Sequence, residues 1–446
     1  MAKQKTRYVC QQCAHVAASW MGRCPECGAW NSLVEELVGG GRSERSASRP
    51  ANVALPMTQV ALGDGGEVRL SVGIGELDRV LGGGLVTGSV VLLGGDPGVG
   101  KSTLLLIAMC AFARRGVRVL YVSGEESARQ VRLRAERLGV ASDELYLLAD
   151  TSLAAVRDAV EQVQPRVMVL DSVQTLHNPE MDGVPGAISQ VREVASAAMH
   201  YAKGREIATF LVGHVTKDGG LAGPKALEHL VDTVLYFEGD GSSSLRVLRA
   251  TKNRFGSTGE IGMFEMREDG LVDVPDASAR LLKERASGAP GTVVTCALEG
   301  SRPLLVEVQA LVGAQTNATP SRTAVGIDRQ RLSLLLAVLG KAGLPLSDHD
   351  VFVSVAGGVR ISEPAVDLAV AVAIHSSFTG QVVPDDLIVF GEIGLVGELR
   401  GVSQPLARLR EAERHGFRAA LVPGTTPEDS GSIRLRRCGM LREAID

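Results

Sequence analysis

The pattern of apolar and polar positions between about residues 57 and 275 alternates between two periods. Short apolar runs of strand length are separated by amphipathic stretches of helical period, such as 127–138 and 186–203. This alternation predicts an α/β domain built from crossover units, with a mostly parallel sheet that helices cover on both faces. Two shorter strands, 232–239 and 244–252, follow without helices between them, and we expect an antiparallel extension there. The apolar runs of the parallel part are 89–95, 117–124, 166–172 and 207–214.

A different pattern begins near residue 276. Strand-like and helical stretches there have their own apolar content, which predicts a separate α+β domain. The expected strands are 292–298, 304–312 and 351–355, and the expected helices are 328–342 and 364–377.

The N-terminal part of the chain is short and polar. A first segment ends near Val38, and residues 39–56 are rich in Gly, Ser and Arg without periodicity, which indicates a flexible tether. We therefore expect four parts: a small N-terminal module at 1–38, a linker at 39–56, the α/β domain at 57–275 and the α+β domain at 276–446.

Composition narrows the class of protein. The 446 residues are 45% hydrophobic and 22% charged, with a net charge of −4, which is typical of globular material and argues against a coat of basic charge. Any contact with DNA must then come from a local patch or a lined channel. No apolar run approaches the ~20 residues that span a bilayer, and the N-terminus has no signal-peptide core. We expect a cytoplasmic protein without membrane contact.

A phosphate-binding pattern follows the first apolar run. GGDPGVGKST places Gly95, Gly100, Lys101 and Ser102 at the spacing of a P-loop, between a predicted strand and a predicted helix. Backbone N–H groups of such a loop receive phosphate oxygens. We expect Lys101 to reach the β- and γ-phosphates of ATP and Ser102 to bind Mg²⁺. The expected nucleotide-binding residues are Gly95, Asp96, Pro97, Gly98, Val99, Gly100, Lys101, Ser102, Thr103 and Asp171.

Three acidic residues follow neighbouring strands of the predicted sheet. Asp171 ends an apolar strand, where a carboxylate can hold Mg²⁺ through water. Glu125 and Glu126 follow the strand after the first crossover helix, and a carboxylate there can polarise the attacking water. We assign the base to Glu125, with Glu126 as a close second. The alternative is that one of the pair is only an acid favoured at a helix start.

Basic and histidine side chains follow later strands. His214 ends the fourth apolar run, where a side chain can sense the γ-phosphate, and the glycine-rich loop after it carries Lys217 and Lys225 as candidate DNA contacts. Lys252 and Arg254 stand two apart in ATKNRFGSTGE, a spacing that puts two strand side chains on the same side of a sheet. Direct DNA contact and a solvated surface pair are alternative roles for these two cations.

Four of the seven cysteines lie within eighteen residues. Cys10, Cys13, Cys24 and Cys27 form two CxxC knuckles at the spacing of a four-thiolate Zn²⁺ site. A segment this short buries little core, so the ion is expected to supply most of its folding free energy. A redox dithiol pair is the alternative. Isolated cysteines such as Cys110 are expected to be buried small hydrophobic residues.

The segment VGIGELDRVLGGGLVTGSVVLLGGDPGVGKST (72–103), with Glu125 and Asp171, resembles the RecA-type ATPase core. Together with the cysteine cluster, KNRFG (252–256) and the C-terminal domain, nearly the whole chain resembles the RadA (Sms) family of bacterial DNA repair proteins. The resemblance implies a hexameric, DNA-dependent ATPase that acts on single-stranded and branched DNA and migrates recombination branches. It also implies that Lys252 and Arg254 serve the γ-phosphate of a neighbouring subunit, and it makes a RecA-type recombinase a candidate partner.

Residues from about 290 onward resemble the proteolytic domain of Lon, whose fold is related to a domain of ribosomal protein S5. Lon-type peptidases use a Ser–Lys pair. The place of the serine is taken here by Ala365, in PAVD, and the place of the lysine falls near Leu406. We therefore expect a scaffold without peptidase activity. Two other functions remain to be weighed against the motor: a nucleotide-switched DNA-binding module without translocation, and an ATP-dependent peptidase.

Overall fold

The chain folds as two units, which we describe separately. The computed structural model describes residues 5–10, 15–30, 32–38, 69–213, 225–239, 244–315, 319–428 and 431–446. The first unit comprises Met1–Gly239 and Arg246–Asp273, and the second comprises Asp240–Leu245 and Val274–Asp446. The four-part division expected from the sequence stays a prediction at the level of its boundaries.

The N-terminal residues form a small antiparallel sheet of their own. Its strand order is β2 (Val16–Ala17), β1 (Lys5–Cys10) and β3 (Leu33–Val38). Its buried apolar side chains are few, and two of them are cysteines, Cys10 and Cys24. A core this small contributes little to the folding free energy, so the segment needs another source of stability.

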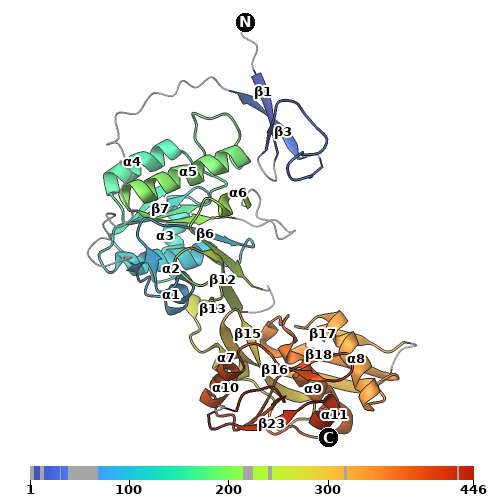
Figure 1. Ribbon diagram of the computed structural model, residues 1–446. Helices are drawn as coiled ribbons and strands as arrows, with labels where there is room; N and C mark the ends of the chain where they lie inside the picture. The colour runs from blue at the N-terminus through green and yellow to red at the C-terminus, as the bar shows by residue number, and fades with distance from the viewer. Residues whose placement is uncertain are drawn as a thin grey trace, which may run out of the picture. The chain divides into compact units, whose positions relative to one another are not determined.

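A nine-stranded sheet organises the rest of the first unit (Figure 1). Its middle strand is β6 (Val90–Gly95), which pairs in parallel with β10 on one side and β11 on the other. The strand order is β14 (Gly270–Asp273), β13 (Ile261–Arg267), β12 (Leu245–Asn253), β11 (Thr233–Glu238), β6, β10 (Ala208–Val212), β9 (Val167–Asp171), β7 (Val119–Ser123) and β8 (Leu145–Ala149).

Helices cover both faces of this sheet, as expected (Figure 1). Alternate residues of β6 divide between two apolar clusters: Val91 and Leu93 pack on the α2 and α3 side, and Val90 and Leu92 on the α4 and α5 side. The helices are α1 (Gly75–Leu81), α2 (Lys101–Ala113), α3 (Ala128–Arg137), α4 (Leu153–Val163), α5 (Ile188–Arg205) and α6 (Lys225–Glu228), and the short strands β4 (Arg69–Leu70) and β5 (Leu85–Val86) pair outside the sheet.

One expectation about the sheet is wrong. The segment 232–239 was expected in an antiparallel extension, but β11 runs parallel to β6. Because β10 and β11 both run parallel to β6, their connection is a crossover. The sequence between them has no long helical pattern that would have predicted one. Antiparallel pairing begins only at β12, which pairs with β11.

The second unit contains a seven-stranded mixed sheet packed against helices. The strand order is β17 (Arg322–Val325), β18 (His349–Val355), β16 (Arg302–Ala314), β15 (Thr292–Glu299), β19 (Leu387–Val389), β22 (Ala419–Pro423) and β23 (Arg434–Cys438). Strands β20 (Glu392–Ile393) and β21 (Leu399–Arg400) form a separate pair. The helices are α7 (Ala277–Leu282), α8 (Arg329–Ala342), α9 (Asp367–Thr379), α10 (Pro405–Arg414) and α11 (Leu441–Ile445). The expected α+β architecture is confirmed. Among the described helices, none is both long and apolar enough to cross a bilayer.

Candidate active site

The P-loop joins β6 to α2 at the carboxyl edge of the sheet. Two positions of the loop require glycine, for different reasons. A Cβ on Gly95 would lie 2.3 Å from the carbonyl oxygen of Phe237 on the neighbouring strand. Gly100 has φ +113°, a backbone conformation that favours glycine. Lys101 and Ser102 are the first residues of α2, so the helix N-terminus and the loop N–H groups point to one anion site.

The Lys101 ammonium lies folded over its own loop. Its Nζ donates to the carbonyl oxygens of Gly95 at 2.7 Å and Asp96 at 3.0 Å, and the residue is buried. Burial lowers the pKa of the Lys101 ammonium, while the negative charges of Asp171, Glu125 and Asp96 oppose that shift. A cation and several carboxylates therefore share this edge of the sheet, which fits a phosphate and a divalent cation bound together.

Asp171 lies at the end of β9, within the electrostatic reach of Lys101. The residue is buried, and its Oδ2 accepts a hydrogen bond of 2.6 Å from the hydroxyl of Tyr121 on β7. Burial, and then the carboxylate of Asp171, raise the pKa of Tyr121 well above its ordinary value, so the phenol is neutral and donates. A carboxylate held this way near the P-loop lysine fits the preference of Mg²⁺ for oxygen ligands.

The two glutamates after β7 differ in their surroundings. Glu125 is exposed, and its charge acts on the Lys101 ammonium. Glu126 forms an ion pair with Arg134 of α3, and its backbone N–H donates to the Ser123 hydroxyl at 3.1 Å. Glu126 is thus held by the helix that follows it in the chain. These contacts favour Glu125 as the side chain that faces the nucleotide, and its role as base stays a prediction.

The side chains of Lys252 and Arg254 reach toward the amino end of β11, away from the edge that carries the P-loop. Lys252 is level with Leu92 across β11, and its Nζ donates to the carbonyl oxygens of Glu228 at 2.6 Å and Val231 at 2.8 Å. Burial, followed by the positive charge of Arg254, lowers the pKa of Lys252.

Arg254 is held by a buried acid that directly precedes β11. Its guanidinium lies 3.0 Å from Oδ1 of Asp232, whose Oδ2 accepts from the backbone N–H of Val90 at 3.1 Å. The P-loop begins at the other end of β6, about 16 Å away at 3.3 Å per residue. The structure therefore does not bring these cations to the P-loop of their own chain.

The predicted γ-phosphate sensor His214 and the candidate DNA contact Lys217 lie outside the residues that the structure describes. The other candidate DNA contact, Lys225, is the first residue of α6.

Three of the four predicted zinc ligands come together. The sulfur atoms of Cys10, Cys24 and Cys27 all lie within 4.8 Å of one another, and the sulfurs of Cys10 and Cys27 are 3.6 Å apart. That distance is far too long for a disulfide bond and close to the edge of a tetrahedron with Zn–S bonds of about 2.3 Å. Cys13 lies outside the described residues. The thiolates fit Zn²⁺.

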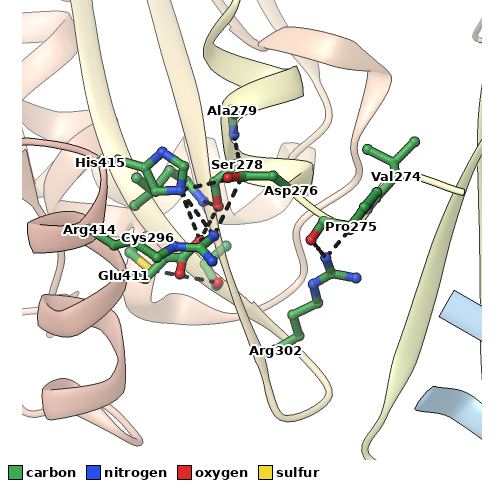
Figure 2. A network of polar contacts seen from close by, with 12 residues as sticks. Val274, Pro275, Asp276, Ser278, Ala279, Cys296, Arg302, Glu411, Arg414 and His415 are labelled. Atoms are coloured by element: carbon green, nitrogen blue, oxygen red, sulfur yellow. Dashed lines mark hydrogen bonds and ion pairs between the residues drawn. The ribbon is translucent and has the colours of Figure 1, made fainter. Parts of the chain in front are cut away.

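A second group of metal-capable side chains is an ion-pair network (Figure 2). Asp276, Glu411 and His415 have ligand atoms within 4.8 Å of one another. The guanidinium of Arg414 lies 3.1 Å from Glu411 and 3.5 Å from Asp276, and the hydroxyl of Ser278 donates to Glu411 at 2.6 Å. Because a cation already pairs with both carboxylates, we assign the cluster to anchoring α7 on α10.

The C-terminal unit carries a buried ion pair beside the position where Lon has its serine. Ala365 is buried, and Leu406 lies in α10. Two residues further along, Arg408 is fully buried and pairs with both carboxylate oxygens of Glu363 at 2.7 Å. Sequence reasoning missed this pair, as it missed Tyr121 and Asp232, because the partners lie far apart along the chain.

Three family models match separate parts of the chain. Residues 8–35 match the rubredoxin metal binding domain, residues 67–220 the AAA domain, and residues 309–426 the family described as subunit ChlI of Mg-chelatase. The chain is 49% identical to DNA repair protein RadA of Halalkalibacterium halodurans over 95% of this chain and 93% of that protein. It is 48% identical to the RadA of Pseudomonas aeruginosa over 100% of this chain and 99% of that protein, and 46% identical to that of Bacillus subtilis over 95% and 93%.

The chain belongs to the RadA family of DNA repair proteins. The resemblance noted from the sequence is therefore confirmed, together with the P-loop ATPase core, the zinc ribbon and the Lon-like C-terminal fold. Among solved structures, a KaiC-like protein of Pyrococcus horikoshii OT3 matches 47% of this chain and 100% of its own, at 22% identity. Its TM-score of 0.39 is too low to support an argument.

Proposed function

We propose that the protein is a DNA-dependent ATPase of DNA repair that works as a ring of identical copies, six by analogy with the family resemblance. It translocates along single-stranded DNA in the cytoplasm and drives branch migration of recombination intermediates. The observation that carries this proposal is the separation of Lys252 and Arg254 from the P-loop of their own chain.

In the proposed ring, the catalytic site is completed by the adjacent copy. The P-loop with Lys101, Ser102 and Asp171 binds Mg²⁺–ATP, and Glu125 polarises the attacking water. Lys252 and Arg254 of the neighbour stabilise the charge that develops on the transferred phosphoryl group. DNA in the ring changes how adjacent copies meet, and so it changes the hydrolysis rate.

Mixed rings test this arrangement. A Lys101→Ala chain keeps the neighbour-facing cations but has no working P-loop, and a Lys252→Ala, Arg254→Ala chain has the reverse defect. Each alone is expected to be inactive, and mixing is expected to restore DNA-stimulated hydrolysis at the interfaces where an intact P-loop meets intact cations. Failure to recover contradicts action across an interface, provided that both variants assemble into mixed rings and that the Lys252→Ala, Arg254→Ala chain still binds nucleotide.

Two further measurements separate the motor from the other functions. ATP hydrolysis is expected to rise on addition of single-stranded DNA, and ATP-driven strand displacement on a forked substrate is expected to disappear with Lys101→Ala. DNA binding without displacement favours the nucleotide switch. We also propose that the C-terminal unit has no peptidase activity, because Ala365 offers no hydroxyl, and a casein degradation assay tests that directly.

A further inference from the structure

The zinc ribbon carries an exposed aromatic surface that the ATPase mechanism does not use. The chain has two tryptophans, and both lie in this short segment. Trp20 is 57% exposed and Trp30 is 72% exposed, and Met21 between them in sequence is 36% exposed. Indole rings are usually buried to a large degree, so two exposed rings on one small module are unusual.

The two indoles border one glycine. A Cβ built on Gly22 would lie 3.8 Å from Cη2 of Trp20 and 3.8 Å from Cζ3 of Trp30, so the two rings flank the same point of the backbone. Because Gly22 has no side chain, it places no atoms beyond the backbone between the two rings. Two aromatic groups at such a separation can contact the same flat ligand or two neighbouring ones.

An arginine is fixed on this surface. Arg23 and Trp30 form a β-bridge across the second cysteine knuckle, and the guanidinium carbon of Arg23 lies 5.8 Å from the centre of the Trp30 ring. Its Nε donates to the carbonyl oxygen of Gly28 at 2.8 Å, which holds the planar group in place. The zinc knuckle therefore sets the positions of Trp30 and Arg23, and Trp20 completes the surface.

We propose that Trp20, Trp30 and Arg23, which we call the ribbon platform, bind single-stranded DNA by stacking on its bases. This inference rests on the proposed function and adds a second DNA contact outside the ATPase ring. Bases stack on indole rings whatever their sequence, and a guanidinium beside the rings can stack on a base or pair with a phosphate.

The size of the platform favours bases over a folded protein partner. Two indoles supply roughly 300–500 Å² of contact surface. A stable protein interface needs about 800 Å² from each side. One or two unstacked bases match the smaller area.

The charge of the N-terminal stretch also favours a polyanion. Residues 1–50 contain seven Lys and Arg against four Asp and Glu, whereas the whole chain has a net charge of −4. A four-thiolate zinc centre adds two negative charges and still leaves the stretch net positive. A local positive region in an acidic protein is the distribution expected of a nucleic-acid contact.

Intrinsic fluorescence of the full chain reads this platform directly, because no other tryptophan is present. The protein is excited at a wavelength where only tryptophan absorbs. Addition of oligo(dT) is expected to quench the tryptophan emission with or without ATP, and also in the Lys101→Ala chain. An oligomer of the same length with abasic sites is expected to quench much less, since it keeps the phosphates and lacks the bases.

Substitutions separate stacking from simple apolar contact. Trp30→Leu is expected to weaken binding of a labelled oligo(dT), measured by anisotropy, at least about fivefold, whereas Trp30→Phe retains most of the affinity. Val34→Ala, at another exposed apolar residue of the ribbon, serves as the matched control and is expected to have no effect. Zinc content of each variant shows that the ribbon is folded.

The outcomes distinguish this inference from the proposed function. If anisotropy reports DNA binding while the tryptophan emission stays constant and Trp30→Leu binds normally, the platform faces something other than DNA and the motor proposal stands. If Trp30→Leu and Trp30→Phe lose affinity equally, stacking is wrong. If the full chain binds no single-stranded DNA at all, both proposals fail.

Discussion

The hydroxyl of Tyr121 lies 2.6 Å from Oδ2 of Asp171, across two buried strands of the central sheet. Tyr121 is on β7 and Asp171 ends β9, and the pairing of these strands places Tyr121 opposite Val169 and Ser123 opposite Asp171. The phenol therefore reaches forward along the sheet to the carboxylate that we expect at the magnesium ion. It acts as a positioning residue, because its hydrogen bond fixes one of the two carboxylate oxygens of Asp171.

Removal of the Tyr121 hydroxyl is expected to change the affinity for Mg²⁺ more than it changes the free energy of unfolding. In Tyr121→Phe, a hydrogen bond to a charged group, with a net worth of about 1.5–3 kcal/mol, is lost from the Asp171 carboxylate. The Mg²⁺ concentration that supports half-maximal binding of a fluorescent ATP analogue is expected to rise roughly tenfold. Tyr201→Phe, on α5, is the control. Unchanged or tighter Mg²⁺ dependence would mean that Tyr121 only fills space.

Substitutions of Glu125 and Glu126 are expected to affect the hydrolysis rate differently. Glu125→Gln is expected to lower single-turnover hydrolysis by about 10²- to 10⁴-fold while nucleotide affinity stays, because only the polarisation of water is lost. Glu126→Gln is expected to reduce the rate far less, since its carboxylate is paired with Arg134. Rapid-quench measurement of both variants decides the matter, and the reverse order of effects assigns the base to Glu126.

The lowered pKa of Lys101 has a consequence for stability. Because burial lowers the folded-state pKa below the unfolded value of about 10.4, the unfolded state holds more protons between the two values. The free energy of unfolding then rises with pH through that window. Lys101→Met is expected to stabilise the nucleotide-free protein at pH 7, with an advantage that shrinks as pH rises toward 10. Thermal unfolding at several pH values measures this, and a constant difference contradicts it.

Local patterns were enough to predict much of this fold. The period of the apolar residues located β6, β7, β9 and β10, and the GGDPGVGKST loop fell between a strand and a helix as the motif requires. The direction of β11 was not predictable, because parallel pairing depends on which edge of the sheet the chain returns to.

The contacts that sequence reasoning could not find are those between distant residues. Asp232 binds Arg254 from the start of β11, and Tyr121 meets Asp171 fifty residues later. Each partner alone is an ordinary polar residue in its sequence, and only the folded sheet brings them together. The CxxC spacing, in contrast, is local, so the grouping of Cys10, Cys24 and Cys27 was accessible from sequence.

Zinc is expected to hold the ribbon together. Treatment with a mercurial reagent is expected to release one Zn²⁺ per chain, and Cys24→Ser is expected to lose the ion and become sensitive to proteolysis within the first 38 residues. Cys438→Ser, at a buried thiol whose pKa burial raises, is the control and keeps its metal. Full zinc occupancy in Cys24→Ser means that this thiolate is not a ligand.

Two ion pairs of the C-terminal unit differ in burial and are expected to differ in energy. Arg408 is fully buried and holds both oxygens of Glu363, whereas Glu398 and Arg400 pair on the surface. Glu363→Gln leaves a buried guanidinium without its counter-charge, which costs about 3–5 kcal/mol. Glu398→Gln is expected to cost far less, because exposed pairs contribute little.

Hydrogen exchange of the full chain measures this difference locally. Amides of β15, whose Leu298 N–H donates to the Glu363 carboxylate, are expected to lose protection in Glu363→Gln and to keep it in Glu398→Gln. Amides of the P-loop strand β6 serve as an internal reference, and nucleotide binding there is expected to be unchanged. Equal loss of protection in both variants would show that the buried pair adds no more than a surface pair. Burial of Arg408 would then need an explanation other than stability.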